Sequence, residues 1–220
     1  MSVSTLFEKA MKLENSGKYD KALQLFDGLL QNSEYDKGDL LFHCGWCLEN
    51  LDPNKTKEVL KYYEEAAQIT QVPICRMNSQ FRCGWLMMHN KDYQVAISYF
   101  LNSIELHEAT QVDDGLYHQS LYWCAICYEF LGFFIESIKL HQQIQKIAPL
   151  LNPESRYREI QCLFKIGSYT EAIQICQTFR DTPPNGFDKI RYQQLRNLTE
   201  LELESLQDYF PDSFLSRKES

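Results

Sequence analysis

The sequence predicts an all-α protein, a right-handed superhelical solenoid of about five stacked helix-turn-helix repeats, and two recurring patterns lead to this. In the first, a turn is followed by a small residue and then, four residues on, usually by an aromatic residue. The small residues, one in each repeat, are Ala22, Val59, Ala96, Ser137 and Ala172, and successive ones are 37, 37, 41 and 35 residues apart. In the second, Cys44-Gly45-Trp46 returns as Cys83-Gly84-Trp85 and Cys124-Ala125-Ile126. Periods in this range are typical of stacked helical arrays, in which each repeat buries its apolar face against its neighbours.

The elements follow in order from these repeats. The first, third and fifth are the clearest, with Gly17-Lys18-Tyr19, Lys91-Asp92-Tyr93 and Gly167-Ser168-Tyr169 at the turn between their two helices. The second and fourth are weaker. Turn-rich segments separate the helices: 31–38, 52–54, 72–73, 112–115, 149–153 and 183–186. Apolar residues recur at helical spacing between these breaks, which predicts ten repeat helices.

Together the two patterns resemble the tetratricopeptide repeat, whose signature is L-G-x2-Y, then A-x3-F, then Pro. Cys44 and Cys83 stand where the family usually has Leu. Pro149 and Pro184 hold the closing-proline place after the fourth and fifth repeats. The resemblance covers roughly residues 3 to 184. It implies a right-handed array in which the first helix of each repeat lines a concave groove.

A further helix is expected from about Asp188 to Tyr209, with Leu195, Leu198, Leu201 and Leu206 on one side. Such a helix shields the open apolar end of a solenoid. Residues 1–184 are therefore predicted to form the repeats, and residues 185–220 the capping helix and tail of the same single domain. The chain after Pro211 is expected to be loose.

Charge and hydropathy exclude several classes of protein. The net charge is −8 and no Lys/Arg block occurs, which argues against a nucleic-acid surface. No run of apolar residues is long enough to span a membrane. The start of the chain shows no signal-peptide pattern, so reduced thiols and a cytoplasmic location are expected.

The eight cysteines allow two interpretations. Cys44-x2-Cys47 and Cys124-x2-Cys127 have the spacing of metal or redox pairs. However, the cysteines recur in register with the repeat, and Leu86 fills one of their positions. They are therefore expected to be small, buried apolar side chains, with no metal and no cofactor.

Catalysis finds little support in the sequence. The five histidines are scattered through different repeats, and no hydrolase, phosphate-binding or H-E-x-x-H motif occurs. Adjacent carboxylates such as Asp113 and Asp114 are typical of solvated loops. The chain is predicted not to be an enzyme.

The informative surface is the expected concave groove. One column of positions on the first helices is aromatic in all five repeats, and a second column contains Trp46 and Trp85. Residues chosen from these columns and from the position four beyond the second form the predicted partner-binding set: Met11, Phe42, Trp46, Phe81, Trp85, His89, Tyr122, Ile126 and Tyr157. The aromatic column has a second interpretation, in which its rings pack in the core between helices. The two tryptophans, one repeat apart, are the expected anchors.

These columns also bear on the ligand. Family members that bind acidic chaperone tails place Lys, Arg and Asn there, whereas this chain has Phe, Trp, His and Met, so that clamp is absent. The predicted function is a scaffold, adaptor or assembly factor that binds a peptide or helix of a partner protein. The alternative is a structural subunit, a homo-oligomer that self-associates through the same groove. A weaker third possibility is a sensor whose superhelix changes on binding.

Overall fold

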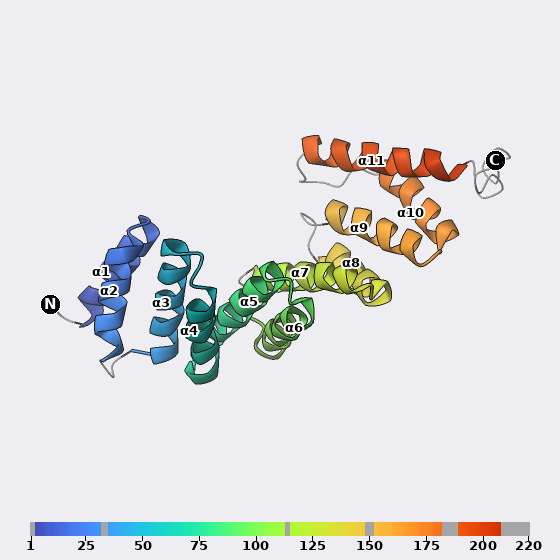
Figure 1. Ribbon diagram of the computed structural model, residues 1–220. Coiled ribbons are helices and arrows are strands. Elements are labelled where there is room, and N and C mark those ends of the chain that lie inside the picture. The colour runs from blue at the N-terminus through green and yellow to red at the C-terminus, as the bar shows by residue number, and fades with distance from the viewer. Residues whose placement is uncertain (1–2, 32–34, 113–114, 148–151, 182–188, 208–220) are drawn as a thin grey trace. The chain divides into compact units, whose positions relative to one another are not determined.

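The computed structural model describes residues 3–31, 35–112, 115–147, 152–181 and 189–207. These residues form eleven helices and no strand, so the predicted all-α class is confirmed (Figure 1). The helices are α1 Val3–Asn15, α2 Tyr19–Leu30, α3 Lys37–Leu51, α4 Thr56–Ile69, α5 Pro73–His89, α6 Tyr93–Thr110, α7 Leu116–Leu131, α8 Phe134–Ile147, α9 Asn152–Lys165, α10 Tyr169–Asp181 and α11 Lys189–Gln207. Across the described ranges, no helix is both long and apolar enough to cross a membrane.

The chain divides into two compact units, residues 1–120 and residues 121–220, called here the N-terminal and C-terminal units. In the N-terminal unit each helix from α1 to α5 packs against the helix that follows it in the chain. In the C-terminal unit α9 packs against α8 and α10. The expectation that repeats and cap form one domain stays a prediction.

The turns between the two helices of a repeat share one backbone feature. A residue with positive φ occupies the same position in four repeats: Gly17 at +73°, Lys91 at +65°, Gly132 at +80° and Gly167 at +78°. Glycine adopts this left-handed conformation without steric cost, which explains its use in three of the four turns. The following helix then begins within two residues, so this turn sets the helix-turn-helix geometry of each repeat.

Asp36 links the start of α3 to the segment that follows α4, the second helix of the same repeat. One carboxylate oxygen accepts the backbone N–H of Asp39 at 2.9 Å, as an N-cap does, and the other accepts the backbone N–H of Gln71 at 2.8 Å. Burial alone would raise the pKa of Asp36, but these backbone hydrogen bonds outweigh it and lower the pKa.

Gly45 and Gly84, which recur in the second sequence pattern, allow helices to approach closely. A Cβ atom built on Gly45 would lie 3.0 Å from the Tyr63 ring, and one on Gly84 would lie 2.8 Å from the Phe100 ring. Phe100 is fully buried. The glycines on the first helices therefore make room for aromatic side chains of the second helices.

Carboxylates on the first helix of one repeat pair with basic side chains on the first helix of the next repeat. The pairs are Glu14–His43 at 2.8 Å, Glu49–Arg82, and Glu129–Arg158 at 3.2 Å. These pairs join the first helices of neighbouring repeats.

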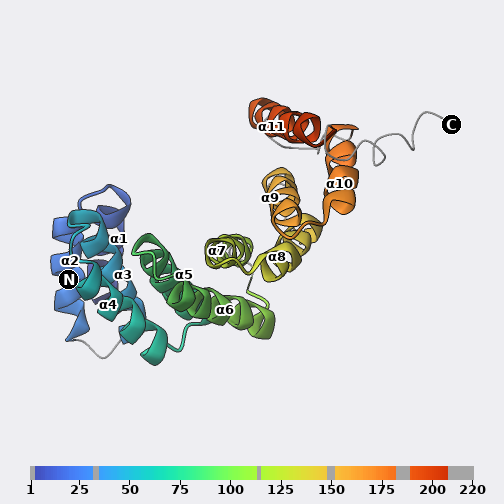
Figure 2. The ribbon, with the colours of Figure 1, turned by 45° about the vertical axis from the view of Figure 1, so that its right-hand side comes forward.

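Helix α11 packs on α9 and α10 in the C-terminal unit (Figure 1; Figure 2). Tyr192, Leu195, Thr199 and Leu203 are its buried side chains, and Tyr192 donates to the Phe179 carbonyl at 2.5 Å. The prediction that the leucines share one buried side is wrong for two of them. Leu198 is 43% exposed and Leu201 is 62% exposed, because positions 195, 199 and 203 form the contacting stripe. Leu206 and the chain after Pro211 lie outside the side chains described.

Candidate functional site

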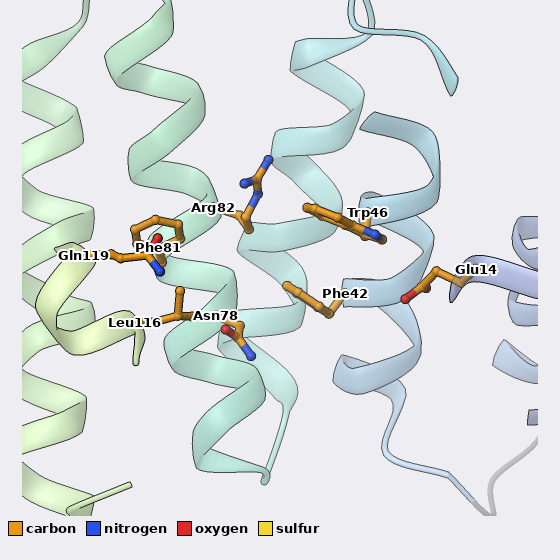
Figure 3. Close-up of a pocket in the computed structure, with 8 residues that line it drawn as sticks. All are labelled: Glu14, Phe42, Trp46, Asn78, Phe81, Arg82, Leu116 and Gln119. Carbon is orange, nitrogen blue, oxygen red and sulfur yellow. The ribbon is translucent and has the colours of Figure 1, made fainter. Parts of the chain in front are cut away.

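A cavity of about 280 Å³ opens on the N-terminal unit (Figure 3). Eight residues line it: Glu14 of α1, Phe42 and Trp46 of α3, Asn78, Phe81 and Arg82 of α5, and Leu116 and Gln119 of α7. Every one belongs to an odd-numbered helix, the first helix of its repeat. First helices of four repeats therefore build this cavity, and the continuous concave groove expected from the sequence stays a prediction.

The apolar walls come from α3 and α5. Phe42 and Trp46 are four residues apart and so project from the same side of α3. Both rings are partly exposed. Phe81 is only 4% exposed and packs against Phe100, with ring centroids 5.7 Å apart. Phe81 is thus a core residue whose edge reaches the cavity, whereas Phe42 and Trp46 present ring surface to it.

Arg82 lies between the two tryptophans that the sequence singled out. Its guanidinium carbon is 4.9 Å from the Trp46 ring centroid and 5.9 Å from that of Trp85. Both carboxylate oxygens of Glu49 accept hydrogen bonds from Arg82, and Glu49 also accepts the Tyr63 hydroxyl at 2.7 Å. The charge of Arg82 is therefore balanced within the protein, and its guanidinium group lies within cation–π distance of both indole rings.

Glu14 is a buried carboxylate at the other side of the cavity. Its Oε2 lies 2.8 Å from His43 Nδ1 and accepts a weak hydrogen bond from the Cys47 thiol at 3.8 Å. His43 is itself held by stacking on Phe26 at 5.0 Å. A buried carboxylate with such partners is typical of a fixed structural group rather than a mobile one.

Asn78 and Gln119 supply the uncommitted polar groups of the cavity. Neither side-chain amide makes a hydrogen bond to any residue within the described part of the chain. Each carries one acceptor and a two-proton donor. They are therefore available to a ligand, while Glu14 and Arg82 are held by internal partners.

The other predicted site residues fall in different places. Trp85 contacts His89 at 4.3 Å between ring centroids, beside the Phe81 ring. Met11 packs against the core formed by α1, α2 and α3. The three remaining residues belong to the C-terminal unit. Ile126 there is only 5% exposed and belongs to the core, and Tyr122 and Tyr157 are half-buried.

The cysteines are packing residues, as predicted. All eight are free thiols and all are buried. Burial raises their pKa values, to about 12 for Cys47, Cys75, Cys127, Cys162 and Cys176 and further for Cys44, Cys83 and Cys124. In the part of the chain that the structure describes, no three His, Cys, Asp or Glu side chains converge as metal ligands would.

Sequence reasoning missed five lining residues: Glu14, Asn78, Arg82, Leu116 and Gln119. A signal for two of them was present, since Asn78 precedes Arg82 by four residues and Arg82 precedes Trp85 by three, which places all three on one side of α5. The prediction considered fixed columns of the repeat, and these polar residues lie between the columns.

The sequence matches no protein-family model, and it matches no curated protein. The structure, however, is similar to solved helical-repeat structures. YrrB, described as a TPR protein with an unusual peptide-binding site, matches over 93% of each chain with a TM-score of 0.65 and 12% identity. TPR-like repeats of a kinesin light chain from Podosopora anserina match with a TM-score of 0.59 and 13% identity, over 92% of this chain and 96% of that one.

A third similar structure is MamA from Desulfovibrio magneticus RS-1. It has a TM-score of 0.62 and 12% identity, covering 81% of this chain and 93% of that one. At such identities the likeness concerns the fold. The chain has a tetratricopeptide-like fold, an all-α solenoid of helical repeats, as the resemblance implied.

Proposed function

We propose that this chain is a non-catalytic protein-interaction module whose N-terminal cavity binds a segment of a partner protein. The observation that carries the proposal is the composition of that cavity. Partly exposed Phe42 and Trp46 stand beside two carboxamides that make no hydrogen bond among the described residues, and the charged residues Glu14 and Arg82 are already held by the internal partners His43 and Glu49.

This arrangement suits a peptide with one large apolar side chain. Burying such a side chain against Phe42 and Trp46 yields about 1.5–3 kcal/mol, and aromatic anchors in pockets dominate many interfaces. The amides of Asn78 and Gln119 both donate and accept, so they match a peptide group, which also does both. A volume of about 280 Å³ accommodates one anchor residue rather than a large cofactor. YrrB, with a similar fold, is described as having a peptide-binding site, which supports the proposal.

The reactive groups near the cavity support a binding role over a catalytic one. The Cys44 and Cys47 thiols have pKa values raised by burial, and a protonated thiol is a poor nucleophile. Glu14 and His43 pair with each other across two helices. Eight buried, free thiols also suit a reducing compartment such as the cytoplasm.

The test is a capture experiment with the full chain and two variants. Proteins retained by the wild type are compared by mass spectrometry with those retained by a Trp46→Ala, Trp85→Ala double variant and by Phe133→Ala. Phe133 is an exposed aromatic of the C-terminal unit, so it controls for general stickiness. We expect a partner that the control retains and the double variant loses. If both variants retain the same proteins as the wild type, the proposal is contradicted. Light scattering of the free chain tests the alternative, which is self-association.

A further inference from the structure

A cavity of about 410 Å³ lies entirely within the C-terminal unit. It shares no residue with the N-terminal cavity, and two second helices contribute to it as well as one first helix. The residues that line it are Gln142, Gln145 and Lys146 of α8, Arg156 and Glu159 of α9, and Ile175 of α10. Three of these side chains are charged, so their pairing determines which ligand the cavity suits.

The negative charge of this cavity, on Glu159, is held by neutral partners. The Glu159 side chain is only 3% exposed. One of its carboxylate oxygens accepts a hydrogen bond from the Gln142 amide at 2.6 Å, and the other accepts from the Gln145 amide at 2.7 Å. Hydrogen bonds make the burial of a carboxylate tolerable, and here two amides supply them. No basic side chain within the described ranges forms an ion pair with Glu159.

Arg156 is held in place without a counter-ion. Its Nη2 donates to the Thr178 hydroxyl at 3.3 Å, and its guanidinium carbon lies 5.8 Å from the Phe179 ring centroid, within cation–π range. Glu159 is three residues away on the same helix, yet Arg156 makes no ion pair with it or with any other residue that the structure describes. Neutral partners on α10 therefore position the guanidinium group and leave its charge uncompensated.

This arrangement differs from that of most arginines in the chain. Arg158, two residues further along α9, pairs with Glu129 at 3.2 Å. Ion pairs with Glu49, Glu154 and Glu200 hold Arg82, Arg191 and Arg196. Among the arginine side chains described, Arg76 is the one other without an ion pair, and its Nη2 donates to the Thr70 carbonyl at 2.6 Å. Arg156 instead presents its charge to a cavity.

The charges of the cavity sum to one excess positive charge. Lys146 is exposed and, like Arg156, makes no ion pair with a described residue, so the two contribute two positive charges against the one negative charge of Glu159. A carboxylate neutralises this excess, whereas a phosphate monoester carries about −1.5 to −2 at pH 7 and exceeds it. A guanidinium group also matches a carboxylate geometrically, because it can donate two parallel hydrogen bonds.

We propose that this cavity binds a small aliphatic carboxylic acid in its ionised form. Arg156 and Lys146 bind the carboxylate, and Ile175 packs against the aliphatic chain. The cavity volume falls within the range of small-molecule pockets, about 300–1,000 Å³. Because the chain as a whole has a net charge of −8, most of its surface disfavours anions, and two unpaired cations in one cavity make this place an exception. The proposal does not depend on the partner site in the N-terminal unit.

A titration of the full chain with sodium pentanoate, followed by NMR, tests the site. The Ile175 methyl signals report contact with the aliphatic chain, and the Gln142 side-chain amide reports the floor of the cavity near Glu159. We expect saturable shifts of both signals with pentanoate, and none with pentanamide, which has a similar shape but no charge. Shifts that do not saturate at constant ionic strength, or equal shifts with pentanamide, overturn the proposal.

Variants of the two basic residues are compared with a matched control. Lys139→Gln removes an exposed lysine of α8 that does not line the cavity. We expect the dissociation constant for pentanoate to rise by about tenfold or more in Arg156→Gln and in Lys146→Gln, and to stay unchanged in Lys139→Gln. Arg156→Lys, which keeps the charge but loses the paired donors, should show a smaller rise. Wild-type affinity in Arg156→Gln, or an equal loss in Lys139→Gln, refutes the site.

Two further ligands identify the source of the anion. Inorganic phosphate and a capped peptide with one internal glutamate are titrated under the same conditions. We expect both to bind more weakly than pentanoate. Tighter binding of phosphate would assign the site to phosphate, and tighter binding of the peptide would assign it to an acidic side chain of a partner protein. Either result overturns the proposal of a free carboxylic acid.

Discussion

Replacing Gly84 by Ala tests whether the repeats are held by close helix approach. The new Cβ would lie 2.8 Å from Phe100 Cε1 and 2.9 Å from its Cδ1, whereas carbon atoms prefer about 3.5–4.0 Å. Phe100 is fully buried and packs on Phe81, so its ring has little room to move. Overpacking of this kind costs about 1–3 kcal/mol.

The backbone effect of the same substitution has the opposite sign. Within a helix, Ala is favoured over Gly by about 1 kcal/mol. Gly28 of α2 isolates this term, because a Cβ there meets no atom within 4 Å. Gly28→Ala should therefore raise the free energy of unfolding by up to about 1 kcal/mol. The free energy of unfolding of Gly84→Ala should be about 1–3 kcal/mol lower than that of Gly28→Ala.

Both glycines belong to the N-terminal unit, so the two variants report on the same cooperative structure. Thermal melts followed by circular dichroism resolve the difference, since 1 kcal/mol corresponds to about 2–4 °C for a chain of this length. Gly84→Ala melting at or above Gly28→Ala would refute the packing argument. It would mean that Phe100 yields without cost.

Three further predictions concern the cap of α3, the thiols and α11. Asp36→Ala should lower the free energy of unfolding by about 1–2 kcal/mol, measured with urea near pH 7. Because the pKa of Asp36 is lowered in the folded state, its stabilising contribution is present above the ordinary pKa of 3.8 and should fade as the pH drops through the folded-state pKa. The eight buried thiols should resist iodoacetamide at pH 8 until the chain is unfolded, as measured by mass; rapid labelling of the folded chain contradicts their burial. Ending the chain after Asp181 removes the helix that covers Phe179, so light scattering should show association of the truncated chain; a clean monomer contradicts a capping role.

The fold was predictable because the repeat is expressed in the residues that pack. The small positions at Gly45 and Gly84 recur with the period of the array, and the structure places an aromatic ring of a second helix over each one. Cysteine at recurring apolar positions predicted burial for the same reason. The packing of such residues is set by neighbours within their own repeat, so their burial can be predicted directly from the periodicity of the sequence.

The site was predictable only in part, because its polar residues depend on neighbours in other repeats. Trp46 and Phe42 were found from their columns. Arg82 was missed, since its role depends on Glu49 in the preceding repeat and on indole faces from two helices. The orientation of α11 was also missed: Leu198 and Leu201 follow helical spacing, yet the contacts made by Leu195 and Leu203 turn them outward. A single helix pattern does not show which of two apolar stripes is covered.

The most direct test of the binding account compares affinity with stability in one variant. A peptide that binds the full chain is selected from a display library, and its dissociation constant is measured by titration with the wild type, Trp46→Ala and Phe133→Ala. The account predicts that Trp46→Ala weakens binding at least about thirtyfold, the equivalent of about 2 kcal/mol, with a smaller loss of unfolding free energy. Phe133→Ala should leave the affinity unchanged. Unaltered affinity in Trp46→Ala together with an unfolding loss of about 3–5 kcal/mol would assign Trp46 to the core and contradict the account.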